Sequence, residues 1–279
     1  MATLRNTIVD DTGFVHLPFG TTAQRPANPV NGDTRFNTTF GYVEYYFMGF
    51  WINAENNRGG IPMDGLLCLL DIGNPLSYNG AGTTITDLSG NGRNGTINGT
   101  VTYGTLATGS RFLSAAPGNS VSIPFNVDAV TGRRFTVLTV AGYNGPTRGR
   151  ITTTNSNNWL LGHWSDGDAR YFAEGWVNQE TSSGTGASLN QWGVHVGTGD
   201  GVVINTVTYD EWQYWKNGGL KTASGITGGS QGPTSLSIGS FNGGELSHWK
   251  WQMLAVWNRV LSGDEIQEIT ANIRARGGF

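Results

Sequence analysis

The sequence predicts an all-β fold, an antiparallel sandwich of two facing sheets with a short helix at its carboxyl end. The first observation is that Asn-Gly pairs recur between apolar runs, with the asparagine at positions 79, 91, 94, 98, 144, 217 and 242. Asparagine tolerates a positive φ and glycine accepts it freely, so this pair favours the type I′ turns of β-hairpins. The second is that charged residues make up only 13% of the chain, which favours a turn-rich β protein.

The third observation is the segment from Trp249 to Trp257, which reads as a strand. Side chains alternate along a strand, which predicts one face made of Trp249, Trp251, Met253, Ala255 and Trp257. The other face begins with Lys250 and Gln252 and then becomes apolar, so the strand is predicted to be central and covered on both sides.

A helix is predicted directly after this strand. Ser262-Gly-Asp-Glu265 is a capping-box pattern, in which the serine side chain and the glutamate side chain satisfy each other's backbone amides. Ile266, Ile269 and Ile273 follow at helical spacing, and Gly277 suits the helix end.

Further strands are predicted wherever short apolar or alternating runs lie between turn signals. Many short strands followed by one late helix indicate an antiparallel sandwich. The predicted strands are Leu66–Asp71, Thr96–Tyr103, Ser120–Pro124, Phe135–Tyr143, Asn158–Gly162, Arg170–Phe172, Trp192–Gly197, Val202–Thr208, Gln213–Lys216, Ser235–Gly239 and Trp249–Trp257.

Composition excludes several classes of protein. The chain has 17 basic and 20 acidic residues and no basic run, so it carries no electrostatic footprint for nucleic acid. Ten Trp and twelve Phe are too many apolar side chains for a disordered chain. No stretch of about 20 apolar residues occurs, so no membrane span is expected. The single cysteine, Cys68, lies in a buried-strand pattern and is predicted to be an inert core thiol.

Residues 1–63 differ in pattern from residues 64–279, which predicts two parts. The first part contains two or three short strands with tight turns and a linker from Asn53 to Met63. A hairpin unit of this size buries little surface by itself, so it is expected to dock on a partner or to oligomerise. The candidate docking residues are Phe36, Tyr42, Tyr45, Phe47 and Trp51.

This first part resembles a short module of phage tail-fibre and other virion proteins. The matching text is the proline- and glycine-punctuated run Leu17 to Pro26, the turn Asn31-Gly-Asp33, the strand Arg35-Phe-Asn-Thr38, and the aromatic strand Tyr42 to Trp51. The resemblance implies a virion structural protein. The start Met1-Ala-Thr-Leu-Arg-Asn lacks the apolar run of a signal peptide, which fits assembly in a host cytoplasm.

The second part resembles the laminin-G / concanavalin A-like jelly-roll family. The resemblance implies the same two-sheet sandwich that the residues predict. One departure is Trp192-Gly-Val-His-Val196, where the family often has Trp-His-His-Val. The matching segments, in order, are Leu69 to Tyr78, Thr86 to Thr96, Trp212 to Gly218, Ser235 to Gly239 and Ala255 to Ile266.

Related folds include glucanases, so catalysis has to be tested. Those enzymes carry Glu-x-Asp-x-x-Glu on one strand, where alternation brings the first two carboxylates to one face. No such run occurs here. Glu265 and Glu268 lie in the predicted helix, and the adjacent Asp210 and Glu211 point to opposite faces of a strand. We therefore predict no catalytic residues and no enzyme activity.

Metal ligation is not supported by residue spacing. Asp166 and Asp168 could offer oxygens to Ca²⁺, but that ion needs about six or more ligands and the spacing does not supply them. His16, His163, His195 and His248 show no metal-ligand spacing. No cofactor is expected.

The best candidate for a ligand surface is the aromatic stretch from Trp159 to Trp176. A sugar presents apolar C–H faces and a ring of hydroxyls, which an aromatic platform flanked by polar groups can meet. Trp159 and Trp164 face opposite ways on one strand, so at most one can join a given platform. The alternative is that these aromatics fill the core. The candidate carbohydrate-binding residues are Trp159, His163, Trp164, Asp166, Asp168, Tyr171 and Trp176.

Together the two resemblances suggest a non-enzymatic protein on the virion surface. Residues 1–63 would contact other virion proteins, and the sandwich would bind a host-surface glycan. A homo-oligomer is expected, with a trimer as one form, because fibre modules of this type associate. Three alternatives stay open: a capsid decoration or cement protein without sugar binding, a glycosidase acting on polysaccharide, and a host extracellular adhesion domain.

Overall fold

The computed structural model describes residues 16–39, 42–47, 50–54, 60–131, 133–179, 191–204, 207–210, 212–221 and 231–279. The chain divides into two compact units, Met1–Gly59 and Gly60–Phe279. The larger unit starts slightly before the predicted boundary at residue 64. Ile61 is buried in its core, and the indole of Trp257 donates to the carbonyl of Pro62 at 2.8 Å.

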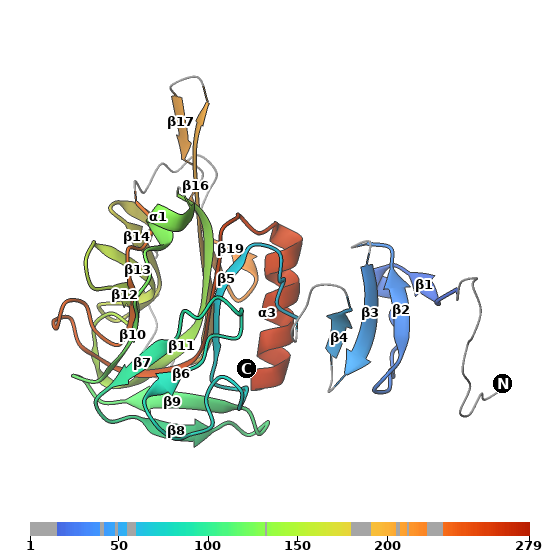
Figure 1. Ribbon diagram of the computed structural model, residues 1–279, viewed down its shortest axis with the longest axis horizontal. Coiled ribbons are helices and arrows are strands. Elements are labelled where there is room, and N and C mark those ends of the chain that lie inside the picture. Colours follow the sequence, from blue (N-terminus) through green and yellow to red (C-terminus); the bar gives the residue numbers. More distant parts are fainter. Residues whose placement is uncertain are drawn as a thin grey trace. The chain divides into compact units, whose positions relative to one another are not determined.

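The larger unit is a sandwich of two mainly antiparallel sheets, which confirms the predicted all-β fold (Figure 1). We call the eight-stranded sheet the open sheet and the nine-stranded sheet the covered sheet. A short helix, α1 (Val127–Thr131), leads into the covered sheet. The open sheet runs in the order β15 (Trp176–Gln179), β14 (Gly167–Ala173), β13 (Trp159–Trp164), β12 (Thr152–Thr154), β20 (Leu236–Ile238), β10 (Ser120–Ile123), β7 (Gly95–Asn98) and β6 (Thr84–Ile85). The covered sheet runs β19 (Gly219–Leu220), β18 (Gln213–Lys216), β16 (Gly193–Ile204), β11 (Arg134–Arg148), β21 (Ser247–Trp257), β9 (Arg111–Ala115) and β8 (Thr102–Thr105), with β17 (Val207–Asp210) on β16 and β5 (Leu66–Asp71) on β21.

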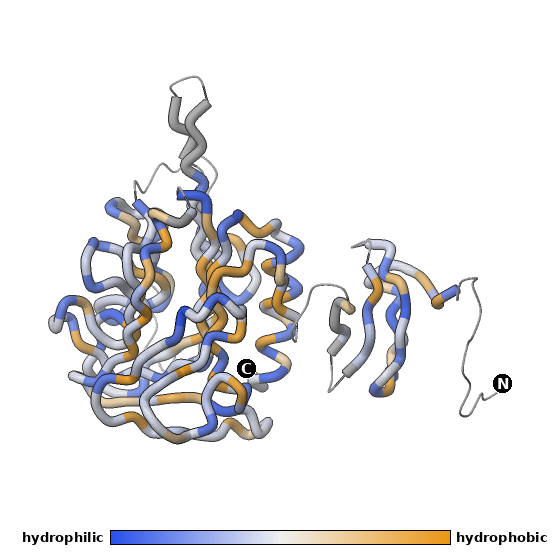
Figure 2. Tube along the Cα trace, in the orientation of Figure 1, coloured by the Kyte–Doolittle hydropathy of each residue, from blue (hydrophilic) through white to orange (hydrophobic). Residues whose placement is uncertain are grey.

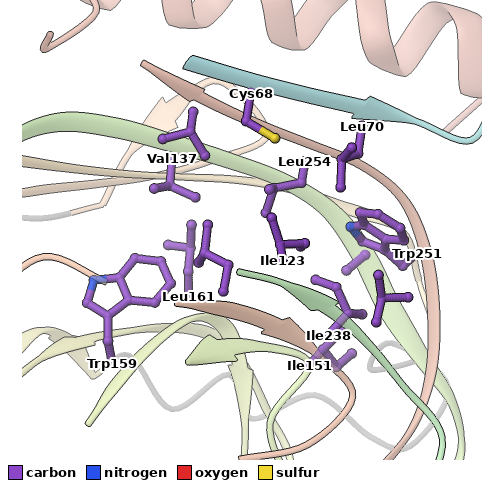
Figure 3. Packing of buried hydrophobic residues seen from close by; sticks show 14 of the residues in the cluster. Cys68, Leu70, Ile123, Val137, Ile151, Trp159, Leu161, Ile238, Trp251 and Leu254 are labelled. Atoms are coloured by element: carbon purple, nitrogen blue, oxygen red, sulfur yellow. The ribbon is translucent and has the colours of Figure 1, made fainter. Parts of the chain in front are cut away.

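The main core lies between the sheets. Figure 3 shows Val137, Leu254 and Trp251 of the covered sheet meeting Ile123 and Leu161 of the open sheet. In Figure 2 apolar stretches follow the strands through the middle of this unit, while polar stretches gather in loops. Burying this apolar surface is the largest favourable term in its folding.

Strand β21 is central, as predicted, but its faces differ from the prediction. Between Ala141 and Val140 of β11 the register of β21 shifts from Trp251 to Met253, so Gln252 is a bulge residue. A bulge adds one residue and reverses the alternation beyond it. The single predicted tryptophan face is therefore wrong. Trp249 and Trp251 join the core between the sheets with Leu254 and Val256, while Met253, Ala255 and Trp257 point to the other face.

That other face is covered by the C-terminal helix α3 (Gly263–Gly277), as Figure 1 shows. Ile266, Ile269 and Ile273 of α3 pack in a second buried cluster with Met253 and Trp257. The predicted capping box is confirmed. The amide of Glu265 donates to the Ser262 hydroxyl at 3.2 Å, and the amide of Ser262 donates to the Glu265 carboxylate at 2.8 Å.

The Asn-Gly pairs act as type I′ turns at only some predicted positions. Asn217 and Gly218 both have positive φ and join β18 to β19, and Asn242 and Gly243 do the same within a small bridge. At position 144 the pair lies inside β11, and at position 94 the glycine begins β7. The predicted strand Thr96–Tyr103 is also wrong, because the chain turns at Gly99 with φ of +94°.

Cys68 is a free, buried thiol, and burial raises its pKa well above the usual value. This agrees with the predicted inert core role. Within the described ranges no helix is both long and apolar enough to cross a membrane.

The smaller unit is a four-stranded sheet in the order β1 (Phe19–Gly20), β2 (Thr34–Asn37), β3 (Tyr42–Phe47) and β4 (Phe50–Asn53), with a short 3₁₀ helix, η1 (Thr22–Gln24). Its buried centre is polar. The Glu44 carboxylate accepts from Arg25 at 2.6 Å and from Asn37 at 2.9 Å, and it lies 3.5 Å from Arg35. Trp51 is buried beside both arginines, with their guanidinium carbons 6.0 and 5.9 Å from its ring.

Candidate functional site

The candidate site lies on the outer face of the open sheet, at strands β13, β14 and β15. Alternation along β14 divides its side chains between two environments. Tyr171, Ala169 and Ala173 point into the core between the sheets. Arg170 and Phe172 therefore project from the opposite face, toward β15.

Three of the predicted sugar-binding residues belong to the core. Trp159 and Tyr171 have 0% exposed surface and pack edge to face with ring centroids 5.7 Å apart. His163 is 1% exposed and lies between the sheets. The prediction that these three residues form part of a ligand surface is wrong, because each lies on the inward face of its strand.

The remaining aromatic residues of this stretch lie together with Arg170. We call these four residues the aromatic patch: Trp164, Arg170, Phe172 and Trp176. Trp176 is its centre. Its ring centroid lies 5.6 Å from that of Trp164 and 5.1 Å from that of Phe172. The guanidinium carbon of Arg170 lies 5.8 Å from the same indole. The three aromatic residues are half-buried, so each keeps part of its ring accessible.

Acidic residues near the patch have cationic or backbone partners. Asp166, at the β13–β14 turn, pairs with Arg148 at 3.3 Å. Asp168 pairs with Lys216 of β18 at 2.9 Å, which ties the two sheets together at this end. Glu174 accepts from the backbone amide of Asn158 at 2.7 Å. These carboxylates are explained by local structure, and Asp166 and Asp168 do not lie in the patch defined by the rings.

Two histidines meet behind the patch, in the interior. The His163 and His195 rings are 4.7 Å apart, and His195 Nδ1 is 2.8 Å from the hydroxyl of Tyr214. Burial lowers the pKa of His163 to about 3 and the pKa of His195 well below its usual value. Both are neutral at physiological pH, so they act as core groups.

No metal centre is found in the part of the chain that the structure describes, where no three His, Cys, Asp or Glu residues are grouped to hold an ion. The patch is an aromatic surface with one guanidinium, and its rings are inclined to one another, at 44° for Trp164 and Trp176 and at 74° for Phe172 and Trp176. Such a surface can stack on the C–H face of a sugar and donate hydrogen bonds to its oxygens.

The candidate docking residues of the smaller unit fall on two faces. The register pairs Phe36 with Phe19 and Val43, and alternation places Tyr45 on the same face. Tyr42 and Trp51 lie on the opposite face, and Trp51 is covered there by the arginines. Trp51 is therefore a core residue rather than a docking residue. The side chain of Phe47 lies outside the described residues.

Sequence reasoning missed Arg170 and Phe172. Both lie within the stretch that was singled out, but the argument from strand faces was applied only to Trp159 and Trp164. The signal that could have found them is alternation along this strand. Ala169, Tyr171 and Ala173 are small or aromatic and are buried, so Arg170 and Phe172, which alternate with them, fall on the other face.

Comparison with protein-family models found no match, and comparison with curated proteins found none either. Solved structures do match. Domain 4 of AbnA, a GH43 extracellular arabinanase from Geobacillus stearothermophilus in complex with arabinotriose, matches with a TM-score of 0.51 and 14% identity, over 74% of this chain and 98% of that chain. A Trypanosoma rangeli sialidase mutant displaying trans-sialidase activity matches with a TM-score of 0.55 and 13% identity, over 78% of this chain. The match spans only 34% of that sialidase chain. These matches confirm the concanavalin A-like sandwich fold.

Proposed function

We propose that this chain is a non-enzymatic virion protein whose larger unit binds carbohydrate through the aromatic patch. The observation that carries the proposal is the cluster of Trp164, Phe172 and Trp176 on the open sheet, next to Arg170. On the covered sheet the tryptophans of β21 are buried, whereas these rings keep exposed surface at the outside of the sandwich. Half-exposed aromatic rings grouped in this way are the usual mark of a binding surface.

The arabinanase domain supports a sugar as the ligand, because that domain was solved with arabinotriose and nearly its whole length matches this fold. The partnered carboxylates near the patch favour binding over hydrolysis. A glycosidase needs one carboxyl group to act as acid and a second to act as base or nucleophile, and Asp166 and Asp168 are each held in an ion pair.

The virion part of the proposal rests on residues 1–63 and their resemblance to fibre modules. In the smaller unit Phe19 is 76% exposed and shares a sheet face with Phe36 and Val43. An apolar sheet face of this kind suits contact with another protein. We propose that this face binds other virion proteins, that the chain forms a homo-oligomer, and that many copies on one particle raise avidity for a weak glycan.

The experiment for sugar binding is a glycan array probed with the full chain. Trp176→Ala and Trp164→Ala should reduce binding about tenfold or more, as expected for central aromatic contacts. Trp192→Ala is the matched control, because Trp192 is a half-buried tryptophan that packs on Phe112 and Phe279. A blank array with wild-type protein, or equal binding by Trp176→Ala, would refute the proposal.

The experiment for the virion role is imaging of the assembled particle. The proposal predicts that Phe19 and Phe36 contact other virion chains and that the larger unit faces outward. A larger unit that bridges capsid subunits would favour the decoration alternative instead.

A further inference from the structure

Arg170 is a nearly buried cation, 7% exposed, with few partners. Its Nη1 donates to the carbonyl of Gln179 at 3.0 Å, and its charge lies over the Trp176 ring. Its Nε is buried and has no hydrogen-bond partner. Across the described ranges, no carboxylate forms an ion pair with Arg170.

The other arginines at this end of the sandwich differ from Arg170. Arg148 pairs with Asp166, and Arg150 forms a close ion pair with Glu245. Arg150 also lies over the ring of Phe241, with its guanidinium carbon 4.1 Å from the centroid. Arg170 is therefore the arginine at the patch whose charge a ligand anion could pair with.

Holding a guanidinium away from water without an anion is costly, and a carbonyl oxygen offsets only part of that cost. A ligand oxygen with a formal negative charge would gain a charge-assisted hydrogen bond, which is roughly twice as strong as a neutral one. A sugar hydroxyl would gain less.

We propose that the aromatic patch selects acidic glycans, with the guanidinium of Arg170 binding a carboxylate or sulfate oxygen while Trp176 stacks on the sugar ring. This inference rests on the proposed carbohydrate binding and adds the chemical class of the ligand. The planar guanidinium can bind either a carboxylate or a sulfate with two hydrogen bonds, so the proposed ligand is defined by its acidic group.

The test is a glycan array of matched pairs, each acidic glycan printed beside its neutral form: oligogalacturonates with their methyl esters, and sulfated glycosaminoglycan fragments with their desulfated forms. The full chain should bind the acidic member of at least one pair about tenfold more tightly than the neutral member. The oligogalacturonate pairs test for a carboxylate and the glycosaminoglycan pairs test for a sulfate as the group that Arg170 binds. Binding to acidic members should weaken as salt is raised.

Arg170→Met should lower binding of the acidic member about tenfold or more and binding of the neutral member by much less, because a neutral oxygen gains only an ordinary hydrogen bond from the guanidinium. The matched control is Arg148→Met, which removes the same charge nearby from an arginine paired with the 71% exposed Asp166. That change should alter binding by less than about threefold, because an exposed pair contributes little.

A second variant guards against a folding defect. A Cβ at Gly167 would lie 2.4 Å from Nε of Arg170, so Gly167→Ala should displace the guanidinium and keep the charge. The end of a flexible side chain can move at little cost, so this variant should fold normally and still lose the acidic preference. Equal binding of acidic and neutral glycans that depends on Trp176 would overturn this inference and leave the proposed function intact. Binding of no glycan at all would overturn both.

Discussion

His163 of β13 and His195 of β16 face each other across the sandwich, with ring centroids 4.7 Å apart and ring planes at 76°. Each ring keeps a buried nitrogen, Nδ1 of His163 and Nε2 of His195, without a partner in the described part of the chain. The two sheets are therefore joined at this end by two neutral imidazoles and, beside them, by the Asp168–Lys216 ion pair.

This pair predicts loss of stability in mild acid. Both folded-state pKa values are lowered, so below pH about 6.5 the unfolded chain binds protons that the folded chain does not. The contribution of these two histidines to the free energy of unfolding should not depend on pH above about pH 7. It should fall between pH 6.5 and 5 by up to about 1.4 kcal/mol per pH unit for each histidine. Urea unfolding at pH 7.5, 6 and 5 measures this slope.

His163→Phe removes one of the two titrating rings while keeping an aromatic ring beside Tyr143. The slope between pH 6.5 and 5 should fall by about half in this variant. An unchanged slope would mean that other groups cause the acid sensitivity.

The β21 bulge predicts a specific role for Gln252. Its buried side-chain amide donates to the Ser110 hydroxyl at 2.9 Å and to the Arg111 carbonyl at 3.1 Å. Gln252→Ala leaves those acceptors without their donor and should lower the free energy of unfolding by about 1–3 kcal/mol. Chemical denaturation measures the loss, and Gln267→Ala on the exposed side of α3 is the control that should show almost none.

The α3 cap gives a smaller expected effect. Ser262→Ala removes the acceptor for the Glu265 amide and should destabilise the larger unit by about 1 kcal/mol. Ser262→Asp keeps an acceptor and should restore most of that stability. Thermal unfolding of the two variants side by side tests the pair, and equal losses in both would contradict a capping role.

The smaller unit depends on Glu44, which is fully buried between Arg25 and Arg35. Glu44→Ala leaves two cations without their shared carboxylate and should cost about 3–5 kcal/mol. Hydrogen exchange of the β2 and β3 amides should then approach that of an unfolded segment, while the amides of β11 and β21 stay protected. Protected β2 amides in the variant would show that the carboxylate is dispensable.

Much of the fold could be predicted from the sequence, because turn pairs, alternation and the Ser262 capping box act locally. Trp249 to Trp257 shows the limit of that reasoning. The strand and its central place are confirmed, but one bulge residue, Gln252, moves Met253 and Trp257 to the opposite face. A bulge is stabilised by neighbouring strands, so the sequence of one strand does not by itself determine where the bulge lies.

The candidate site shows the same limit. Trp164 and Trp176 were predicted and lie together at the surface, whereas Trp159 and Tyr171 lie in the core. Aromatic content alone does not distinguish the two faces of a sheet. The face of each residue depends on the strand bounds and on the register shift after Gly162, which only the paired strands define.

The most direct test of glycan binding by the aromatic patch is a titration of the full chain, labelled with ¹⁵N at its tryptophan indoles, with the glycan that binds most tightly on the array. The account predicts that the indole signals of Trp164 and Trp176 shift with ligand concentration, while those of the buried Trp159, Trp249 and Trp251 stay in place. Shifts confined to other tryptophans, or no shift at saturating ligand, would contradict it.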